Sequence, residues 1–441
     1  MSGTSIEVVL KRRARLSDQP ARDAALLRAP DRVAADAVRR DVAAIMATVR
    51  RRGDEGVREL TLALDGVSLD ALEVPRAAWE AAPAALDPAL LGAMQRTVRN
   101  LRLAHEADRP RAHEVEIESG VTVGRRPDPL GRVGVYAPGG RAAYPSSVLM
   151  GVVPARIAGV AEILVCSPPG LDGMPARVVL AAAALAGADR VFAIGGAQAI
   201  AALAMGTESV PRVDRVVGPG NAWVAEAKLQ VVNDVGIDAP AGPSELLVIA
   251  DDSAPAALVA REMVAQAEHD PGARVVAIVI GAVAEGALEP ALGAAVRAAA
   301  RREVVERSLA TGGAVFRAES VDDAIAFAFA NAYAAEHVLL ALRDADRVLA
   351  ALRNAGAVFV GASSSVAFGD YMTGANHVLP TGGLARAYSG LSTSDFVRWT
   401  SWQRVTPDAA AALAHDVAVF ATAEGLPGHA SAALAWGAPA C

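Results

Sequence analysis

Four of the seven histidines in this 441-residue chain lie in polar segments that also contain a carboxylate or an amide side chain. The four segments are 266–270, 336–337, 369–380 and 424–429. Imidazole nitrogens, carboxylates and amide oxygens are all reasonable zinc ligands, and histidine and glutamate are frequent general acids and bases. The segments together therefore indicate a metal site, an acid–base site, or both, although each one alone could hold an ordinary structural histidine.

The first segment is predicted to end a helix. Gln266 and His269 lie three residues apart, just before the Pro271-Gly272 pair that stops the helix. Residues three apart share one face of a helix, so an amide oxygen and an imidazole would point the same way. That is half of a zinc site, but a plain surface histidine near a helix end would look the same.

The other three segments carry their polar groups at element ends or in loops. Glu336 and His337 are adjacent at the start of an apolar run, and at a strand end both side chains can reach a cleft. Asp370 and His377 lie in a Gly-rich loop, where polar residues are functional more often than on helix faces. Segment 424–429 joins two helical patterns through a tight turn, with a glutamate at one end and a histidine at the other.

The remaining histidines and the two cysteines offer less. His105, His113 and His415 lack such a context and are expected to be structural. Cys166 and Cys441 cannot form a disulfide framework or a cysteine zinc site. Aldehyde oxidation can proceed through a thiolate, but Cys166 lies in an apolar run that predicts a buried strand, so we expect no nucleophilic role for it.

Three Gly-rich turns follow predicted strands, at residues 138–140, 195–198 and 218–221. Such turns let a backbone approach a ligand closely at the carboxyl edge of a parallel sheet. None of the three is a G-x-G-x-x-G fingerprint, and the chain contains no P-loop motif. The turns therefore predict a ligand site without identifying the ligand.

Length and charge restrict the remaining possibilities. A chain of 441 residues is expected to form two or three domains. Its net charge of −7 argues against a nucleic-acid partner, which requires a concentrated basic patch. No apolar stretch approaches the ~20 residues of a spanning helix, and the first residues lack a signal-peptide pattern. We therefore expect a cytoplasmic protein with no nucleic-acid or membrane partner.

Hydrophobic periodicity predicts an α/β protein. Residues 31–110 look helical, and after residue 132 short β-branched runs alternate with alanine-rich helical stretches. The predicted strands form two series, 132–136, 162–166, 190–194 and 215–217, then 245–249, 273–280, 337–342 and 357–360. Because such βα repeats build parallel sheets, the expected fold has two incomplete Rossmann-like parallel-sheet domains with helical N-terminal and C-terminal extensions.

The same pattern gives domain boundaries. Residues 1–30 are expected to form an N-terminal arm. Residues 31–115 and 245–390 would form the first α/β domain, and residues 116–244 the second. Residues 391–441 carry helical patterns but are too few to bury a core of their own, so they are expected to pack on another domain or on another subunit.

Ordered motifs from about residue 57 to nearly the end resemble the histidinol dehydrogenase family. The segments that carry the resemblance are VGVYAPGGRAAYPSSVLM from Val133, GGAQAIAALAMGTE from Gly195, VVGPGNAWVAEAK from Val216, GIDAPAGPSELLVIAD from Gly236, QAEHDP from Gln266, AAEHVLL from Ala334, GDY from Gly369, NHVLP from Asn376 and EGLPGH from Glu424. The resemblance implies zinc-dependent oxidation of L-histidinol to L-histidine through bound L-histidinaldehyde, with two successive hydride transfers to NAD, in histidine biosynthesis.

The resemblance also implies roles for the matching residues. One zinc ion per subunit would be held by Gln266, His269, Asp370 and His429. Substrate would contact these four ligands together with Ser244, His337, His377 and Glu424, and NAD would contact Tyr136, Gln198 and Asn221. Glu336 and His337 would be the acid–base pair. Zinc and substrate would belong to the first α/β domain and NAD to the second, and residues 391–441 would complete the site of the neighbouring subunit in a homodimer.

The chain departs from the family pattern at Ala335, where proline is usual, at Leu339, where glutamate is common, and at Ala430, where arginine is frequent. Because Ala335 and Leu339 lie close to the expected acid–base pair, a related enzyme for another small alcohol, such as a sulfonated propanediol, stays an alternative. A zinc hydrolase could use the same ligands and Glu336, but it would leave the three Gly-rich turns without a role. A non-catalytic metal-binding or scaffold protein would not need the acid–base pair beside a full ligand set.

Overall fold

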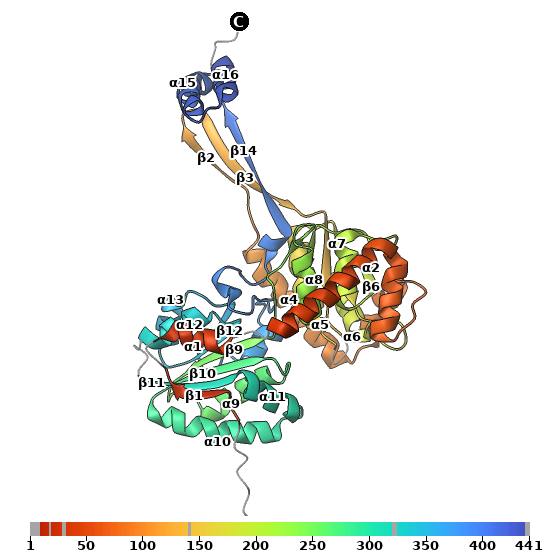
Figure 1. The fold of residues 1–441 in the computed structure, drawn as a ribbon, viewed down its shortest axis with the longest axis vertical. Coiled ribbons are helices and arrows are strands. Elements are labelled where there is room, and N and C mark those ends of the chain that lie inside the picture. The colour runs from red at the N-terminus through yellow and green to blue at the C-terminus, as the bar shows by residue number, and fades with distance from the viewer. Residues whose placement is uncertain (1–8, 17–18, 29–31, 140–142, 320–323, 437–441) are drawn as a thin grey trace, which may run out of the picture.

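The computed structural model describes residues 9–16, 19–28, 32–139, 143–319 and 324–436. These residues form two α/β bodies, each built on a parallel sheet, and a long arm that stands away from them (Figure 1). Gly140 of the first Gly-rich turn and Cys441 lie outside the described residues. No helix in the described ranges combines the length and the apolar character that crossing a membrane requires. The predicted α/β class is confirmed.

A six-stranded parallel sheet forms the first body. Its strand order is β1 (Arg12–Arg15), β11 (Gly313–Ala318), β10 (Arg274–Ile280), β9 (Glu245–Ala250), β12 (His337–Ala341) and β13 (Ala357–Val360). Helices α1 (Pro20–Leu27), α12 (Ala324–Tyr333) and α13 (Ala345–Ala351) cover one face, and α9 (Ala256–Ala267), α10 (Ala282–Ala298) and α11 (Arg302–Gly312) cover the other. The central strands are rich in Val, Ile and Leu and buried, as parallel strands covered on both faces must be.

The N-terminal segment is part of this body rather than a helical extension. β1 forms one edge of the sheet and pairs with β11, and α1 packs against α12. Neither β1 nor β11 was predicted, because β1 is a short, arginine-rich edge strand and β11 continues directly from the end of α11. Pairing and packing with distant elements fix both strands.

A five-stranded parallel sheet forms the second body. Its strand order is β6 (Arg190–Ala193), β5 (Glu162–Ser167), β4 (Arg132–Tyr136), β7 (Arg215–Val217) and β8 (Gly236–Ile237). The crossover helices are α5 (Pro145–Ala158), α6 (Arg177–Ala186), α7 (Gly196–Met205) and α8 (Ala222–Gln230). One contiguous core contains side chains from the strands and from these helices.

The structure corrects the predicted grouping of residues 31–115 with residues 245–390. The elements concerned are α2 (Arg32–Asp65), α3 (Arg76–Glu80), the 3₁₀ helix η1 (Ala82–Ala85) and α4 (Pro88–Ala107). α2 packs on α7 and α8, and α4 packs on α5 and α6, so Val42, Met46 and Leu101 are buried in the core of the second body. An apolar helix stripe shows that a helix packs on something, but not on which sheet.

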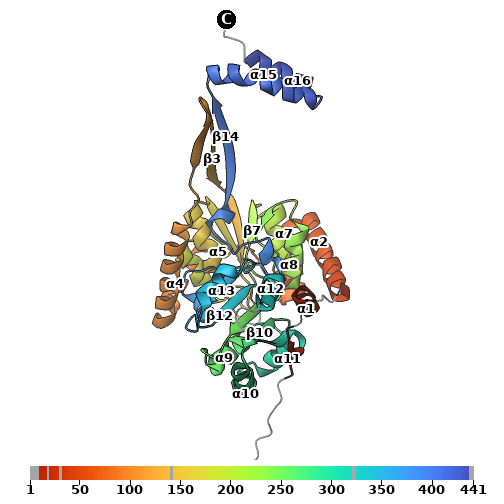
Figure 2. The same cartoon turned by 90° about the vertical axis from the view of Figure 1, so that its left-hand side faces the viewer.

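The arm is a three-stranded antiparallel sheet with two helices at its far end (Figures 1 and 2). β2 (His113–Glu118) and β3 (Val121–Pro129) form a hairpin, and β14 (Val397–Val405) pairs with β3 before α15 (Pro407–Ala423) and α16 (Pro427–Trp436). The prediction of a helical C-terminal extension is therefore wrong in part, because this extension contains the strand β14. α15 and α16 bury only a small alanine cluster against each other, and they do not lie on the two bodies of their own chain.

Three short elements complete the fold. They are α14 (Val366–Tyr371), η2 (Leu384–Arg386) and η3 (Thr393–Phe396). Of these, α14 follows β13 and packs on the side of α9, where Val366 N donates a hydrogen bond to the Glu262 carboxylate at 3.1 Å. This contact directs the end of α14 toward the amino edge of the six-stranded sheet.

Candidate active site

The candidate residues of the first body meet at the amino edge of its sheet. Ser244 directly precedes β9, Glu336 directly precedes β12, and His337 is the first residue of β12. Asp370 reaches the same edge from α14, where its carboxylate oxygen lies 3.6 Å from Nε2 of His337. Ligands of open α/β sheets usually bind at the carboxyl edge, so the strand pattern alone did not indicate this position.

The Glu336–His337 pair is held by the main chain of a single residue, Glu245. The Glu245 N–H donates to Oε2 of Glu336 at 2.8 Å, and the Glu245 carbonyl lies 3.2 Å from Nδ1 of His337. Both side chains are about 95% buried. Because a carbonyl only accepts, Nδ1 carries a proton in this contact. Nε2 of His337 has no hydrogen-bond partner among the described residues, so it is the ring nitrogen available to a ligand.

Neighbouring carboxylates decide the charge of this imidazole. Burial by itself lowers the pKa of His337, but Glu336 and Asp370 outweigh burial and raise the pKa to about 10, so the imidazole is charged at neutral pH. A cation held by Asp370 would cancel part of this rise and favour the neutral imidazole, which is the form that can take a proton. In return, the pKa of Asp370 is lowered: burial would raise it, and the imidazoles of His337, His377 and His269 more than compensate. His377 also donates from Nδ1 to the main-chain carbonyl of Asp370 at 2.9 Å. The structure thus places Asp370 close enough to His337, His377 and His269 for each imidazole to affect its pKa.

The helix end in segment 266–270 differs slightly from the prediction. α9 ends at Ala267, so His269 lies just beyond the helix rather than on its last turn. Its Nδ1 is 2.9 Å from the carbonyl of Ala265, one of the carbonyls that a helix end leaves unpaired. That contact fixes the imidazole with the proton on Nδ1 and the lone pair on Nε2, which is the form that binds a metal.

The donors at this edge fit a zinc ion. Gln266 is 97% buried, and its amide nitrogen has no partner among the described residues. An amide oxygen, an imidazole Nε2 and the depressed-pKa carboxylate of Asp370 are suitable zinc donors. Among the described residues of one chain, however, no three His, Cys, Asp or Glu side chains are arranged to hold a metal ion. The candidate donors of one chain include only two such side chains, His269 and Asp370, beside the Gln266 amide.

The two remaining predicted residues of this set lie elsewhere in the chain. Glu424 caps the end of α15 and His429 lies in α16, and both are exposed. Figures 1 and 2 place these helices at the far end of the arm, remote from the amino edge of the six-stranded sheet. Within one chain, the structure does not bring Glu424 or His429 to the other candidate residues.

The second body carries the Gly-rich turns at the carboxyl edge of its sheet. Tyr136 ends β4, and its hydroxyl accepts a hydrogen bond from Gly196 N at 3.1 Å. Burial, with smaller effects from Asp65 and Cys166, raises the pKa of Tyr136 to about 12, so the phenol stays neutral. Gln198 is almost fully buried, and its amide oxygen has no partner in the described part of the chain. These polar groups can meet a ligand at the turns.

Asn221 has a clear structural role in the third turn. Its side-chain oxygen accepts from the main-chain nitrogens of Trp223 and Val224, each at 3.1 Å, and so caps α8. The backbone of this turn also approaches β4 closely, because a side chain at Gly218 would collide with the carbonyl of Tyr136. The turn therefore needs glycine at this position, where φ is 115°.

Sequence reasoning missed the groups that hold the turns from behind. Lys228 and Asp238 form a buried ion pair that binds both main-chain groups of Gly218: Asp238 accepts from its N–H at 2.7 Å, and Lys228 donates to its carbonyl at 2.8 Å. Asp65, at the end of α2, accepts from the Gln198 amide at 3.3 Å. The sequence did offer one sign of the ion pair, because Lys228 and Asp238 are charged residues within otherwise apolar patterns. Nothing in the sequence pointed to the contact of Asp65 with Gln198.

The family departures lie in packed positions behind the site. Ala335 and Leu339 belong to the cores on opposite faces of the six-stranded sheet, and Ala430 belongs to the alanine cluster of the arm. Ala334 is the only non-glycine residue with positive φ in the described ranges, at 48°. It lies two residues before Glu336, so a strained main-chain position directly precedes the acid–base pair.

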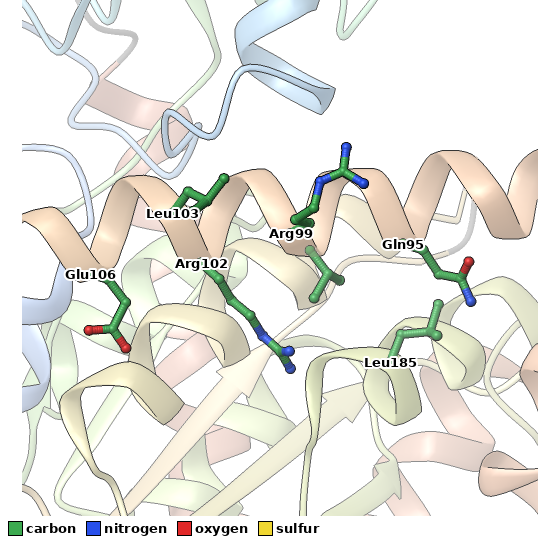
Figure 3. A pocket seen from close by; sticks show the side chains of 7 residues that line it. Gln95, Arg99, Arg102, Leu103, Glu106 and Leu185 are labelled. Carbon is green, nitrogen blue, oxygen red and sulfur yellow. The ribbon is translucent and has the colours of Figure 1, made fainter.

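A cavity elsewhere offers no comparable chemistry. Its volume is about 440 Å³, and it lies between α4 and α6 (Figure 3). Its lining residues are Gln95, Val98, Arg99, Arg102, Leu103, Glu106 and Leu185. None of the predicted site residues lines it, so we do not assign the chemistry there.

Comparison with known proteins agrees with this arrangement. The family model described as histidinol dehydrogenase matches residues 29–435. The histidinol dehydrogenase of Methanosarcina mazei is 45% identical over 390 residues, which cover 88% of this chain and 89% of the relative. That of Natronomonas pharaonis is 48% identical over 393 residues, with 89% and 92% covered. The crystal structure of histidinol dehydrogenase from Elizabethkingia anophelis matches with a TM-score of 0.90 at 30% identity, covering 97% of this chain and 98% of its own.

The buried thiol provides a direct test of the site assignment. Cys166 lies in β5, fully buried as predicted, and burial raises the pKa of the thiol well above its usual range. We expect iodoacetamide at mildly alkaline pH to leave Cys166 unmodified in the native protein and to alkylate it after denaturation, as measured by mass spectrometry of its peptide. Cys166→Ala should keep full activity. Rapid alkylation of Cys166 in the native protein, accompanied by loss of activity, would instead support a nucleophilic role for this thiol.

Proposed function

The chain belongs to the histidinol dehydrogenase family, and from that premise we propose that it oxidises L-histidinol to L-histidine through bound L-histidinaldehyde, in two successive hydride transfers to NAD. The family assignment makes the chain an NAD-dependent oxidoreductase. The observation that carries the full proposal is the convergence of Glu336, His337 and Asp370 at one buried edge, with Nε2 of His337 left without a hydrogen-bond partner among the described residues.

The metal part of the proposal rests on the donor set. Gln266, His269 and Asp370 would hold one zinc ion per subunit, with His429 of a second copy as the fourth ligand. When bound, zinc supplies a positive charge that orients the amine and imidazole nitrogens of the substrate. The Nδ1-protonated form of His269 supports its assignment. The buried Gln266 amide nitrogen without a partner indicates that this side chain faces a group that the described residues do not supply.

The acid–base steps follow from the geometry of the pair. His337 Nε2 takes the proton of the substrate hydroxyl while hydride leaves the carbinol carbon. Glu336 then takes a proton from the water that adds to the aldehyde, and a second hydride transfer from the hydrate gives the carboxylate. Ser244, His377 and Glu424 would contact the substrate around this centre. The balance is one histidinol, one water and two NAD+ consumed, with one histidine, two NADH and three protons formed when the substrate enters with its amine protonated.

The cofactor would lie against the turns of the second body. Tyr136, Gln198 and Asn221 would contact it, and the Gly-rich main chain at residues 195–196 and 218–220 allows close approach. The neutral, buried Tyr136 hydroxyl and the unpaired amide oxygen of Gln198 support this placement of the dinucleotide. NAD would then lie at the carboxyl edge of the five-stranded sheet, and the substrate at the amino edge of the six-stranded sheet.

We also propose a homodimer in which each arm completes the site of the other copy. The arm helices expose Phe420, Leu434 and Trp436, with 70%, 52% and 83% of each side chain accessible. Phe368 and Tyr371 on α14, beside Asp370, are also more than half exposed. Apolar patches of this kind mark contact surfaces. A second copy of the chain would cover both patches if its arm packed against α14. That arm would then bring Glu424 and His429 to Gln266, His269 and Asp370.

Turnover provides the first test of the proposed reaction. Purified, zinc-loaded protein offered L-histidinol should form two NADH per histidinol, followed by NADH absorbance, and a chelator should abolish the reaction. His337→Asn should lower kcat for both steps by about 100-fold or more, since it removes the base. Glu336→Gln should mainly slow oxidation of the aldehyde. No turnover by folded, zinc-bound protein would disprove the substrate, and other small alcohols would then be screened.

Mixing inactive variants tests the shared site. His269→Ala alters the body and His429→Ala alters the arm, so each homodimer should be inactive. Co-expressed together, they should recover about a quarter of wild-type activity, because half the dimers are mixed and each contains one intact site.

The matched control combines two body variants, His269→Ala and Asp370→Ala. Every site in their mixed dimers is defective under the proposal, so no activity should return. Failure of His269→Ala and His429→Ala to complement in dimers shown to be mixed would contradict a shared site.

A further inference from the structure

We propose that Arg28 and Glu245 are positioning residues for the acid–base pair, so that the N-terminal segment controls the rate of oxidation. The inference rests on the proposed function for its kinetic readout. Neither residue reaches substrate or cofactor in the proposed site. Both act through the main chain of Glu245, which touches Glu336 with its N–H and His337 with its carbonyl.

One residue therefore sets the orientation of two catalytic side chains. The N–H of Glu245 is 2.8 Å from Oε2 of Glu336, and its carbonyl is 3.2 Å from Nδ1 of His337. Glu245 lies at the start of β9, directly beside β12 in the sheet, where Leu246 is in register with His337. A small rotation of the first peptides of β9 would change both contacts at once.

The side chain of Glu245 is held from the N-terminal segment. Its carboxylate is 99% buried and pairs with both terminal nitrogens of Arg28, at 2.8 and 2.9 Å. Arg274 is more distant, at 3.6 Å. The Nη2 contact is a hydrogen bond and the Nη1 contact adds a close ion pair, so together they restrict the direction of the carboxylate as well as its distance. Arg28 thus determines where the Glu245 side chain, and with it the start of β9, can lie.

Arg28 is itself fixed at the end of α1. Its guanidinium lies over the ring of Tyr333, 4.0 Å from the centroid, and only 11% of its side chain is exposed. Tyr333 is the last residue of α12, on which α1 packs. The contact therefore extends over 217 residues of sequence, from the N-terminal helix to the first strand of the acid–base edge.

Removal of Arg28 would leave two buried carboxylates close together. Glu245 and Glu336 repel each other enough that Glu336 adds to the rise in the pKa of Glu245, whereas Arg28 opposes that rise; burial is the largest cause, and the pKa is about 7. Without the guanidinium, the Glu245 side chain must move or take up a proton. Either change disturbs the peptide that holds Glu336 and His337.

The N-terminal segment contains a matched control. Arg12 pairs with the buried Asp23 at 2.7 Å and lies over the ring of Phe316, 5.6 Å from the centroid. This arginine–carboxylate pair lies within the N-terminal segment, and the Arg12–Phe316 contact attaches the same segment to the same body. It touches neither Glu245 nor the acid–base pair.

The test compares Arg28→Ala, Arg28→Lys and Arg12→Ala in the full-length, zinc-loaded protein. Arg28→Ala should lower kcat for L-histidinol by about 10- to 100-fold, as expected for a small displacement of catalytic groups. Its KM for NAD and its zinc content should stay unchanged. Added guanidinium ion should restore part of kcat, Arg28→Lys should be intermediate, and Arg12→Ala should keep the wild-type kcat.

Two results would overturn the inference. One is an unchanged kcat in folded Arg28→Ala, and the other is an equal loss in Arg12→Ala, which would indicate a general anchoring effect. If the wild type does not oxidise histidinol, the proposed function fails separately. The crystal structure of Arg28→Ala then decides: displacement of His337 from the Glu245 carbonyl supports the inference, and an unchanged contact refutes it.

Discussion

Burial of two glutamates and a histidine at one sheet edge is the constraint on which the rest of the first body depends. Buried ionisable groups destabilise a fold unless each finds a partner. Here the partners are the main chain of Glu245 for the acid–base pair and the Arg28 guanidinium for the Glu245 carboxylate. The N-terminal helix, the order of the strands and the chemistry of the edge are therefore parts of one arrangement.

A short connecting segment joins the sheet proposed to bind the cofactor to the sheet that carries the acid–base pair. Residues 238–244 connect β8 of the five-stranded sheet to β9 of the six-stranded sheet. At one end, Asp238 and Lys228 hold the Gly218 peptide beside Tyr136, and at the other end Glu245 holds the acid–base pair. A cofactor at the first end and a substrate at the second would be positioned by a single short segment.

Much of this arrangement could be predicted from the sequence. Runs of Val, Ile and Leu predicted eight strands in two series, and polar residues at element ends were identified as candidates, although not the edge where Asp370, His337 and His377 meet. Three features could not be predicted because they depend on contacts between distant residues. They are the packing of α2 and α4 on the second sheet, the pairing of β14 with β3, and the Arg28–Glu245 ion pair. Periodicity records which face is buried, not which surface covers it.

The location of the metal tests the central proposal most directly. Diffraction data collected at the zinc absorption edge from crystals of zinc-loaded protein would locate the ion without reference to activity. We expect one anomalous peak per subunit, bounded by Gln266, His269 and Asp370 of one chain and His429 of the partner subunit. A peak at another place, or one coordinated only by residues of a single chain, would contradict the shared zinc site and the account of the arm.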